Sequence, residues 1–357
     1  MAQISVRTFT EQDLPDFQML SQTEYGTSAS TTDATHIRWK HLNSPFGAST
    51  YICLEEEGKV VGRALVQPRQ LCTTSKVLAA ASVMDLLIDR AHRTTPGNFM
   101  QITKATGKAT GFDLIYHTSN EKTFPLYSKL LRFPNPFSLR AYGFPLRIAG
   151  VLASRIGRRL ALLDLLTAPW RGLLTLSSVI ASTIARLDVT HSPISDDELA
   201  TLSSKCLHHA ESHLSRTNTF LKWRFADAPQ WPATVYRVTH NGKFQGYVAT
   251  RRVELDGMVH WVLMDMFLDV DTPFTARIAL RLWLIRQAAA AGADALFTMI
   301  NPSSAVARTA VGFPLIAIPE RMLPHTTPIF VRVLNTDDKI PESYTSLHLT
   351  LADLDYF

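Results

Sequence analysis

The sequence predicts an α/β (α+β) protein built from two similar halves, and the first observation behind this prediction is an internal repeat. Landmark residues of the first half recur in the second half at a nearly constant offset of 180 to 184 positions. Self-similarity at a fixed period is the sequence signature of a duplicated unit. The pairs are Trp39 with Trp223, Gly62 with Gly246, Asp85 with Asp265, Asn120 with Asn301, and Phe133 with Phe313.

Length and composition are the second observation. A chain of 357 residues accommodates two domains of roughly 150 residues and a connector. Hydrophobic residues make up 46% of the chain, which supplies two full cores, and only 19% of the residues are charged, so no segment has the composition of a disordered region. We therefore expect domains over residues 1–144 and 187–357, joined by a connector over residues 145–186.

The third observation is the alternation of strand and helix patterns, which begins in the first half. Thr10 and Asp13 have the spacing of a capping box and predict that a helix starts there. The dipeptide Glu57-Gly58 predicts a hairpin turn between two strands. Alternating or continuous apolar runs predict the other elements. Strands are expected over residues 4–8, 50–55, 60–68, 80–89 and 112–118, and further helices from the loop at 93–98 to about residue 110 and over 121–131.

The second half repeats this order of elements. Helical periodicity and apolar runs of strand length alternate from residue 196 onward. The apolar run over 259–268 corresponds to the run over 80–89, and both suit a central, buried strand. Helices are expected over 196–212, 275–291 and 303–311, and strands over 233–239, 246–253, 259–268, 295–300 and 346–351.

The connector over residues 145–186 is rich in Leu, Ile, Ala and Arg and predicts one or two helices, broken near Pro169. Its longest uncharged run, over residues 172–185, has 14 residues and is too short to cross a bilayer. Two interpretations stay open: a helical hairpin packed between the domains, and a basic amphipathic segment that touches a membrane surface or covers a long acyl chain. Three arginines have helical spacing and would share one face: Arg155, Arg158 and Arg159.

The net charge and the spacing of the cysteines limit the kinds of ligand and the compartment that we expect. The formal net charge of +5 favours anionic ligands, such as phosphorylated cofactors, or anionic surfaces, but it is too diffuse to indicate nucleic acid binding. Cys53, Cys72 and Cys206 have no metal-ligand spacing, so we expect small buried side chains in a reducing compartment and no metal. The N-terminal residues have no signal-peptide pattern, which favours the cytoplasm, with the inner face of the membrane as a further location if the connector binds lipid.

The order of the expected elements is strand-helix-helix-strand-strand-strand-helix-strand-helix-strand, with the long helix after the fourth strand. This order resembles that of the GCN5-related N-acetyltransferase (GNAT) superfamily, and the resemblance covers nearly the whole chain outside the connector, once per half. It implies two tandem GNAT-like domains, each a mixed, mostly antiparallel, twisted sheet flanked by helices. It also implies an N-acyltransferase that transfers the acyl group of acetyl-CoA, or of another acyl-CoA, directly to a primary amine.

A loop after the fourth strand carries part of the resemblance. In the superfamily this loop has the form Arg/Gln-x-x-Gly-x-Gly/Ala and holds the pyrophosphate of coenzyme A, which exposed N–H groups and a helix dipole favour. The matching stretch is Arg93-Thr94-Thr95-Pro96-Gly97-Asn98, in which Pro96 removes one donor. The cofactor-binding residues that the resemblance implies are Leu86, Leu87, Ile88, Arg93, Thr94, Thr95, Gly97, Asn98, Phe99 and Asn120.

An asparagine and a tyrosine carry the rest of the resemblance. The superfamily often has Asn at the end of the fifth strand and Tyr seven residues later, and Asn120 and Tyr127 keep this spacing. In the second half, Asn301 is followed at the same distance by Arg308, and the loop over 269–274 has two carboxylates and no glycine, which disfavours phosphate. The resemblance therefore implies that the first half binds the cofactor, with Tyr127 as general acid, and that the second half is a degenerate copy.

The catalytic base stays open between two residues. In the superfamily the thioester lies between the fourth and fifth strands, where a backbone N–H near residues 86–88 stabilises the oxyanion. Asp85 and His117 lie on these two strands, and either could remove the proton of the amine. Asp85 has a counterpart in the second half, which favours a structural role, whereas His117 has none.

The tryptophan that ends the second helix of each half, Trp39 or Trp223, is followed by a cation, Lys40 or Arg224. Because this pair is duplicated, we expect a structural role, in which the aromatic ring packs under the sheet beside the stem of the cation. The alternative is a wall of the substrate site.

Three functions stay open. The first is an acyl-CoA-dependent N-acyltransferase of the acetyltransferase type. The second is a long-chain acyltransferase that uses acyl carrier protein or acyl-CoA, as N-acyl amino acid synthases do; the connector would then cover the acyl chain, and the positive charge would suit an acidic carrier protein. The third is a non-catalytic scaffold or binding protein. The acceptor amine stays undefined, because variable loops form the acceptor pockets of this fold. The oligomeric state, monomer or dimer, also stays open, because an internal pair of domains already supplies the contact that a dimer would make.

Overall fold

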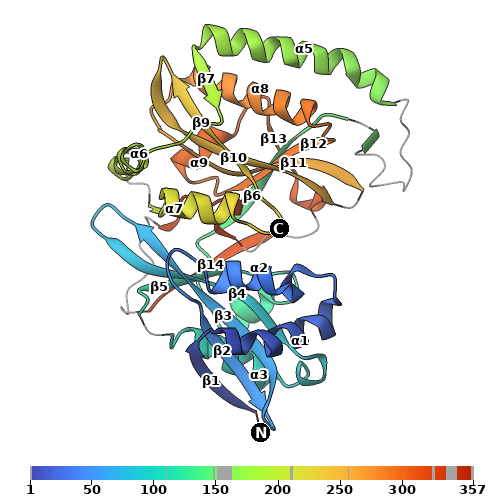
Figure 1. Cartoon of the computed structure of the whole chain (residues 1–357), viewed down its shortest axis with the longest axis vertical. Coiled ribbons are helices and arrows are strands. Elements are labelled where there is room, and N and C mark those ends of the chain that lie inside the picture. Colours follow the sequence, from blue (N-terminus) through green and yellow to red (C-terminus); the bar gives the residue numbers. More distant parts are fainter. Residues whose placement is uncertain are drawn as a thin grey trace.

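The structure is a computed structural model that describes residues 2–109, 111–147, 149–150, 163–209, 212–255, 257–323, 326–334 and 344–354. Within these residues the chain forms two lobes (Figure 1). Each lobe is built around a sheet, and the same order of strands and helices occurs in both.

The first lobe confirms most of the expected elements. Thr10 and Asp13 form the expected capping box, in which the N–H of Thr10 donates to Asp13 Oδ2 at 2.8 Å. Glu57 and Gly58 have φ angles of 51° and 75°, as a two-residue hairpin turn requires. The strands of this lobe are β1 (Gln3–Thr8), β2 (Thr50–Glu56), β3 (Lys59–Cys72), β4 (Val77–Ile88) and β5 (Leu114–Thr118), and its helices are α1 (Leu14–Tyr25), α2 (Ala34–His41) and α3 (Pro96–Thr106).

The second lobe contains the corresponding elements and several short additions. Its helices are α5 (Leu163–Ile184), α6 (Asp196–His208), α7 (Asn218–Leu221), α8 (Phe274–Ala290) and α9 (Ala305–Ala310). Its strands, together with two that connect the lobes, are β6 (Phe137–Pro145), β7 (Leu187–Thr190), β8 (His213–Leu214), β9 (Thr234–His240), β10 (Lys243–Leu255), β11 (Met258–Leu268), β12 (Ala295–Ile300), β13 (Ile316–Ala317) and β14 (Thr327–Val333).

Helices pack on both faces of the sheet in the first lobe. Alternate residues of β2 point to opposite faces, as the two-residue period of a strand requires. Tyr51 and Cys53 belong to the apolar cluster beneath α1 and α2, whereas Ile52 and Leu54 belong to the cluster beneath α3. The resulting three layers leave the end of the sheet beside β5 free to meet the second lobe.

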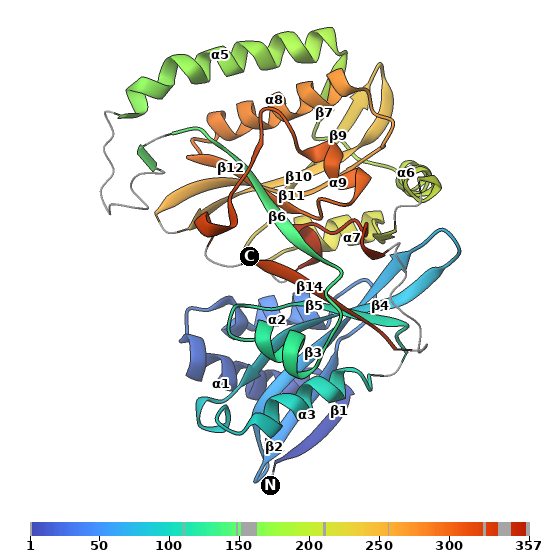
Figure 2. The ribbon, with the colours of Figure 1, turned by 180° about the vertical axis from the view of Figure 1, so that it is seen from behind.

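The two lobes share one continuous sheet of fourteen strands within the described residues, because each lobe receives a strand from the other half of the chain. β14, from the end of the second half, inserts between β5 and β6 and pairs with β5 in antiparallel register, with Phe330 opposite His117. β6, from the end of the first half, begins beside β14 and then runs between β12 and β13, with Arg140 opposite Ile300. Figure 2 shows β6 passing from one lobe into the other.

Trp39 and Trp223 join the lobes through a reciprocal pair of hydrogen bonds. Trp39 Nε1 donates to the Trp223 carbonyl at 2.7 Å, and Trp223 Nε1 donates to the Trp39 carbonyl at 2.8 Å. The two buried rings stack at 5.3 Å between centroids. The expected structural role is therefore present, but the rings pack on each other between the lobes instead of under separate sheets. Lys40 is buried and paired with an acid, so it does not reach solvent as a snorkelling cation would.

Several expected elements differ in the structure. The helix expected over 121–131 is reduced to turns and a single π-helical turn at Leu126–Leu130. The closing strand expected over 346–351 is instead a loop with two isolated bridges, at His348 and Thr350, followed by a short 3-10 helix. The position it would occupy in the sheet, beside β12, is already filled by β6. Strands β6 and β14 were not predicted, because their apolar patterns are short and their pairing partners are distant in sequence.

The connector forms helix α5, which packs along α8 on the side of the second lobe that faces away from the first lobe (Figure 1). The expectation of a hairpin between the domains is therefore wrong for the described part of the connector. The break expected at Pro169 is also absent, and α5 continues through this residue. Packing along α8 offsets the cost of an interior proline, which is about 3 kcal/mol. Arg155, Arg158 and Arg159 lie outside the described residues. Among the helices that are described, none is both long and apolar enough to cross a bilayer.

We predict that Trp39→Phe lowers the free energy of unfolding by about 2 kcal/mol, because the change removes a buried hydrogen bond and leaves the Trp223 carbonyl without its donor. Trp223→Phe should have the same effect, and the double variant should cost less than the sum of the two single changes, since both act on one contact. Urea denaturation measures these differences. Trp170→Phe, at a half-exposed residue of α5, is the control and should change the value by less than about 0.5 kcal/mol. Equal effects of Trp39→Phe and Trp170→Phe would contradict the prediction.

Candidate functional site

Strands β4 and β5 separate in the middle of the first lobe and open a cleft between them. Their parallel pairing covers only Ala80 to Ser82 on β4 and Leu114 to Tyr116 on β5. Beyond this point the strands line a cleft of about 410 Å³. Residues from β4 and β5 and from the turns after β5 surround it, among them Leu86, His117 and Tyr127.

A β-bulge lies on the β4 side of this cleft. Leu65 of β3 pairs with Met84 and Arg63 pairs with Leu87, so the two residues Asp85 and Leu86 stand opposite a single residue of β3. Asp85 has a φ angle of 48°, which is rare for a residue with a side chain. Bulges turn backbone N–H groups out of the regular ladder, so this segment is free to present an N–H to a ligand in the cleft. Leu87 and Ile88 return to regular register with β3.

The side chain of Asp85 is only 6% exposed and is bound to two neighbouring residues of α2. Its Oδ2 lies 2.7 Å from His41 Nε2 and 2.8 Å from Lys40 Nζ. Burial acts to raise the pKa of Asp85, but the Lys40 ammonium and the hydrogen bond from His41 outweigh it and hold this pKa well below its usual range. Burial lowers the pKa of His41 to about 4, so the ring is neutral at pH 7 and its other nitrogen lies 3.0 Å from Ser49 Oγ. Asp85 is therefore a carboxylate at pH 7 and a poor acceptor of a full proton.

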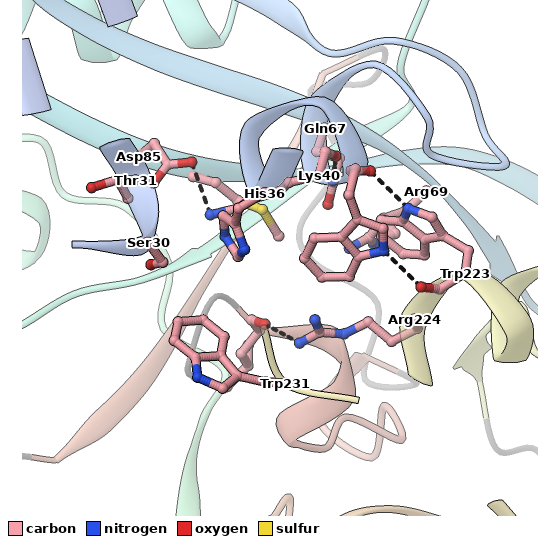
Figure 3. A pocket seen from close by; sticks show the side chains of 13 residues that line it. Ser30, Thr31, His36, Lys40, Gln67, Arg69, Asp85, Trp223, Arg224 and Trp231 are labelled. Atoms are coloured by element: carbon pink, nitrogen blue, oxygen red, sulfur yellow. Dashed lines mark hydrogen bonds and ion pairs between the residues drawn. The ribbon is translucent and has the colours of Figure 1, made fainter. Parts of the chain in front are cut away.

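A second cavity, of about 140 Å³, also borders Asp85 and lies between the two lobes (Figure 3). Met84 and Asp85 line both this cavity and the cleft between β4 and β5, so the two spaces meet at the bulge. Aromatic rings form much of the cavity wall, and the ring of His36 contacts those of Trp39 and Trp231 at 5.3 and 5.4 Å. Its polar and charged lining residues are Ser30, Thr31, Lys40, Gln67, Arg69, Asp85 and Arg224.

Tyr127 and His117 lie together on the β5 side of the cleft. Their ring centroids are 4.3 Å apart, and both rings contact Phe330 of β14. Burial raises the pKa of Tyr127 against a smaller, opposing effect of Thr103 of α3, and this keeps the phenol protonated. Burial, with the charge of Arg332, lowers the pKa of His117 to about 3. A histidine with such a low pKa is a weak base, so the geometry brings His117 to the cleft without making it a suitable proton acceptor.

The loop after β4 leads into α3 as expected. Thr95 occupies the N-cap position, and its side chain forms no cap hydrogen bond with the first turn of the helix. Exposed Thr94 precedes it, and at Gly97 an added Cβ would make only an ordinary contact, at 3.9 Å, with Gln101 Nε2. Arg93 turns back, donating to the Ile88 carbonyl at 2.7 Å and pairing with Glu24 at 2.8 Å. The uncapped helix start is suited to an anion, whereas the Arg93 side chain is already engaged.

Three further predicted cofactor residues have partners within the protein. Asn98 Nδ2 donates to the His92 carbonyl at 3.0 Å, which fixes the loop before α3. Phe99 packs edge-on against Tyr127, with ring centroids 5.3 Å apart. Asn120 Oδ1 accepts hydrogen bonds from the N–H groups of Lys122 and Thr123, so it shapes the turn after β5 although it also lines the cleft.

The equivalent gap in the second lobe is closed by hydrogen bonds. Thr298 Oγ1 of β12 donates to the Leu263 carbonyl of β11 at 2.9 Å and bridges the point where the strands would separate. Asn301 Nδ2 donates to the carbonyls of Thr345 and Leu347, which draws the C-terminal segment over the gap. The same segment pairs Thr350 with Ile300 of β12.

Asp265, the counterpart of Asp85, also differs in its surroundings. It accepts hydrogen bonds from Arg216 Nε at 2.8 Å, from the Tyr247 hydroxyl at 2.7 Å and from Thr350 Oγ1 at 3.0 Å. All of these groups are buried. Asp265 therefore anchors the C-terminal segment, whereas Asp85 faces two cavities.

Sequence reasoning missed most of the second cavity. Gln67 belongs to the strand predicted over 60–68, Arg69 lies one residue beyond the predicted end of that strand, and His36 precedes Trp39 in the second predicted helix. None of the three stands in a recognisable motif. The sequence signals that did reach this cavity were Asp85 and the duplicated pairs Trp39-Lys40 and Trp223-Arg224, which supply part of its wall. No group of three or more potential metal ligands occurs in the described residues.

Comparison with known proteins relates this arrangement to solved structures. A GCN5-related N-acetyltransferase from Anabaena variabilis superimposes with a TM-score of 0.57 at 10% identity, over 93% of this chain and 73% of that one. The chain has the fold of the GCN5-related N-acetyltransferases. Similar values hold for such a protein from Kribbella flavida, with a TM-score of 0.54 at 11% identity over 94% and 72% of the two chains. An N-myristoyltransferase from Saccharomyces cerevisiae with bound myristoyl-CoA gives 0.54 at 14% identity over 92% and 79%. Neither protein-family models nor curated proteins gave a match to the sequence.

We predict that the protein loses stability as the pH falls from 6.5 towards 4. Four buried histidines have a folded-state pKa below their ordinary value of 6.5: about 4 for His36, His41 and His213, and about 3 for His117. In each case burial is the largest cause. Between these values the unfolded chain binds protons that the folded chain does not, so each histidine costs up to about 1.4 kcal/mol per pH unit.

Urea denaturation at pH 5, 6 and 7 measures this slope. The variant His117→Gln should bind about one proton fewer on unfolding. The slope of the unfolding free energy against pH should therefore fall by about 1.4 kcal/mol per pH unit. His191→Gln, at an exposed residue, is the control and should leave the slope unchanged. Asp85 should not contribute in this range, because its lowered pKa places its protonation at more acidic pH. A slope that is the same for both variants would refute the assignment of His117 as a buried neutral ring.

Proposed function

We propose that the protein is an acyl-CoA-dependent N-acyltransferase whose reaction takes place in the first lobe. One observation carries this proposal: the cleft between β4 and β5 and the cavity between the lobes meet at Met84 and Asp85. The cleft and the polar, aromatic cavity that meet at the bulged strand supply neighbouring places for a thioester and an amine. The reaction would occur at the bulge between them.

The mechanism is direct attack of the amine on the thioester carbonyl carbon. A C–N bond forms, the C–S bond breaks, and the thiolate of coenzyme A leaves. The attacking nitrogen gives up one proton to solvent, the thiolate gains one from Tyr127, and solvent restores the phenol, so the protons balance. An N–H of the bulge, at Asp85 or Leu86, donates to the carbonyl oxygen and stabilises the negative charge that develops there. The pantetheine arm lies between β4 and β5, and the uncapped start of α3 binds the pyrophosphate.

Asp85 and Tyr127 have different roles in this mechanism. The Asp85 carboxylate accepts a hydrogen bond from the amine and orients it, with Lys40 and His41 fixing the carboxylate. Its lowered pKa suits an orienting group better than a base. Tyr127 is protonated at pH 7 and lies in the cleft, so it is the candidate that donates a proton to the departing thiolate. His117 packs beside Tyr127 and positions it.

The second lobe supports the first and does not catalyse. We assign residues 1–144 and 187–357 to two related domains, joined by the connector over 145–186, as products of an internal duplication. Two features support a degenerate second copy. The hydrogen bond of Thr298 bridges the strands where a pantetheine arm would have to enter, and the carboxylates of the loop at 269–274 repel a phosphate group. This copy contributes Trp223 and Arg224 to the wall of the cavity.

A long-chain acyl donor is the second candidate. The yeast N-myristoyltransferase structure carries bound myristoyl-CoA, and the match covers a larger share of that chain than of either bacterial acetyltransferase. The same site would then transfer a fatty acyl group from acyl-CoA or from acyl carrier protein. The chemistry at Asp85 and Tyr127 would be unchanged.

We predict that Tyr127→Phe lowers kcat at least tenfold while the protein remains folded, because removing the phenol removes the proton donor for the thiolate. Release of free coenzyme A, followed with a thiol reagent, measures turnover. Tyr236→Phe, at a partly buried tyrosine of β9 in the second lobe, is the control and should retain full activity. Full turnover in Tyr127→Phe would remove the assignment of this residue.

Calorimetric titration should distinguish the donors. We expect binding of acetyl-CoA or of a long-chain acyl-CoA with a dissociation constant in the micromolar range or below, at one site per chain. Acyl carrier protein loaded with a fatty acid is the third ligand to be tested. Binding of only the long-chain thioesters would favour the second candidate, and the absence of binding by all three would contradict the proposed function.

A further inference from the structure

Arg69 is a buried cation at the wall of the cavity between the lobes. Only 4% of its surface is exposed, and its guanidinium stacks over the ring of Trp223 at 5.1 Å (Figure 3). Its contacts are the Pro68 carbonyl at 3.5 Å and the Tyr116 hydroxyl. No carboxylate lies within ion-pair distance of Arg69 among the residues that the structure describes, and its Nε has no hydrogen-bond partner there. A buried charge without a counter-ion is costly, so this position is suited to an anion supplied from outside the chain.

Two other buried polar atoms around the same cavity lack partners within the described residues. They are Gln67 Oε1 and His36 Nδ1, on side chains that are 1% and 5% exposed. Gln67 is held in place because its amide nitrogen donates to the Lys40 carbonyl. The His36 ring is neutral at pH 7, so Nδ1 can accept a hydrogen bond. Three unpartnered polar atoms around one cavity indicate a polar ligand and not an apolar one.

The register of β3 and β4 places these groups in a row. Gln67 and Arg69 are two residues apart on β3 and share one face of the sheet. They lie opposite Ser82 and Ala80 of β4. Ala80 is five residues from Asp85, which corresponds to about 16 Å along the strand at about 3.3 Å per residue. The cavity thus has a carboxylate at one end, an amide in the middle and a guanidinium at the far end.

We propose that the acceptor is a small, elongated aminocarboxylate, with its amine at Asp85 and its carboxylate at Arg69. This inference rests on the proposed function and specifies the acceptor of the same site. A guanidinium binds a carboxylate through two parallel N–H donors, and Gln67 and His36 accept hydrogen bonds from polar groups between the two ends. The aromatic rings of Trp39 and Trp231 contact the apolar part of the molecule.

The charges of the cavity argue against a polyamine. Lys40, Arg69 and Arg224 line the cavity, against the single carboxylate of Asp85. A second ammonium group would lie among these cations and be repelled, whereas a carboxylate compensates Arg69. A volume of about 140 Å³ also limits the acceptor, or the part of it that enters, to the size of a small molecule.

Linear amino acids with a terminal amine and chain lengths from glycine to 8-aminooctanoate provide the test, each compared with the alkylamine of equal length. Calorimetry measures their binding to the full chain without thioester, and release of coenzyme A measures KM and kcat with the donor that binds. We expect the aminocarboxylates to bind at least tenfold more tightly than the alkylamines, with the best ligand at an intermediate length. Arg69→Gln should reduce this preference to less than threefold, and Arg69→Lys should retain part of it because the charge is kept.

Arg281→Gln is the matched control. Arg281 is buried in α8, donates to the Val311 carbonyl, and pairs with no carboxylate among the described residues, but it lies away from the cavity. This variant should retain the full preference for aminocarboxylates, so it separates a loss of binding from a general effect of losing a buried arginine. If Arg69→Gln does not fold, the Arg69→Lys variant and the comparison of aminocarboxylates with alkylamines on the unaltered chain still test the inference.

The outcomes separate the two proposals. Binding of aminocarboxylates that depends on Arg69 supports this inference even if no thioester is turned over, and in that case only the proposed function fails. Equal binding of aminocarboxylates and alkylamines, or a preference that Arg69→Gln leaves unchanged, overturns the inference while turnover of any amine still supports the proposed function. Tightest binding of glycine overturns the elongated form of the acceptor.

Discussion

The exchange of strands between the lobes is the constraint on which the rest of the structure depends. β14 completes the sheet of the first lobe, and β6 completes the sheet of the second, so neither half of the chain contains all the strands of its own sheet. The reciprocal hydrogen bonds of Trp39 and Trp223 fix the lobes at a second point. Because the sheet is continuous, the cavity between the lobes is bounded by parts of one hydrogen-bonded framework and not by two independent bodies. A binding site at such a junction can hold its groups in fixed positions, which the proposed acyl transfer requires.

Asp85 and Asp265 occupy corresponding positions in the two lobes but have different surroundings. Asp85 lies in a bulge with a positive φ angle and faces two cavities, where Lys40 and His41 hold it. Asp265 is enclosed by Arg216, Tyr247 and Thr350 and anchors the C-terminal segment. The difference arises from the neighbours and not from the residue itself. In one lobe the space beside the aspartate is left open, and in the other the chain fills it.

Local patterns predicted most individual elements but few of their partners. The capping box at Thr10, the Glu57-Gly58 turn and the apolar run of β4 depend on neighbouring residues, so their positions could be derived from the sequence. Strands β6 and β14 could not, because a strand gains its stability from the edge with which it pairs, and those edges lie about 150 or more residues away. The helix expected over 121–131 shows the same limit: its sequence permits a helix, but packing of Tyr127 against His117 and Phe330 leaves only a π-helical turn.

By itself the sequence determined the GNAT-like order of elements, the repeat, and the location of the cleft at Asp85, His117 and Tyr127. These features follow from local periodicity and short spacings, which the chain encodes directly. Only the tertiary structure decided that Lys40 and His41 hold Asp85, and that Gln67 and Arg69 join His36 around one cavity. Those residues come from separate elements, and their charges and hydrogen bonds acquire a role only when folding removes them from water and brings them together. Most arginines in proteins lie at the surface. Arg69 indicates a binding site because it is buried without a counter-ion among the described residues.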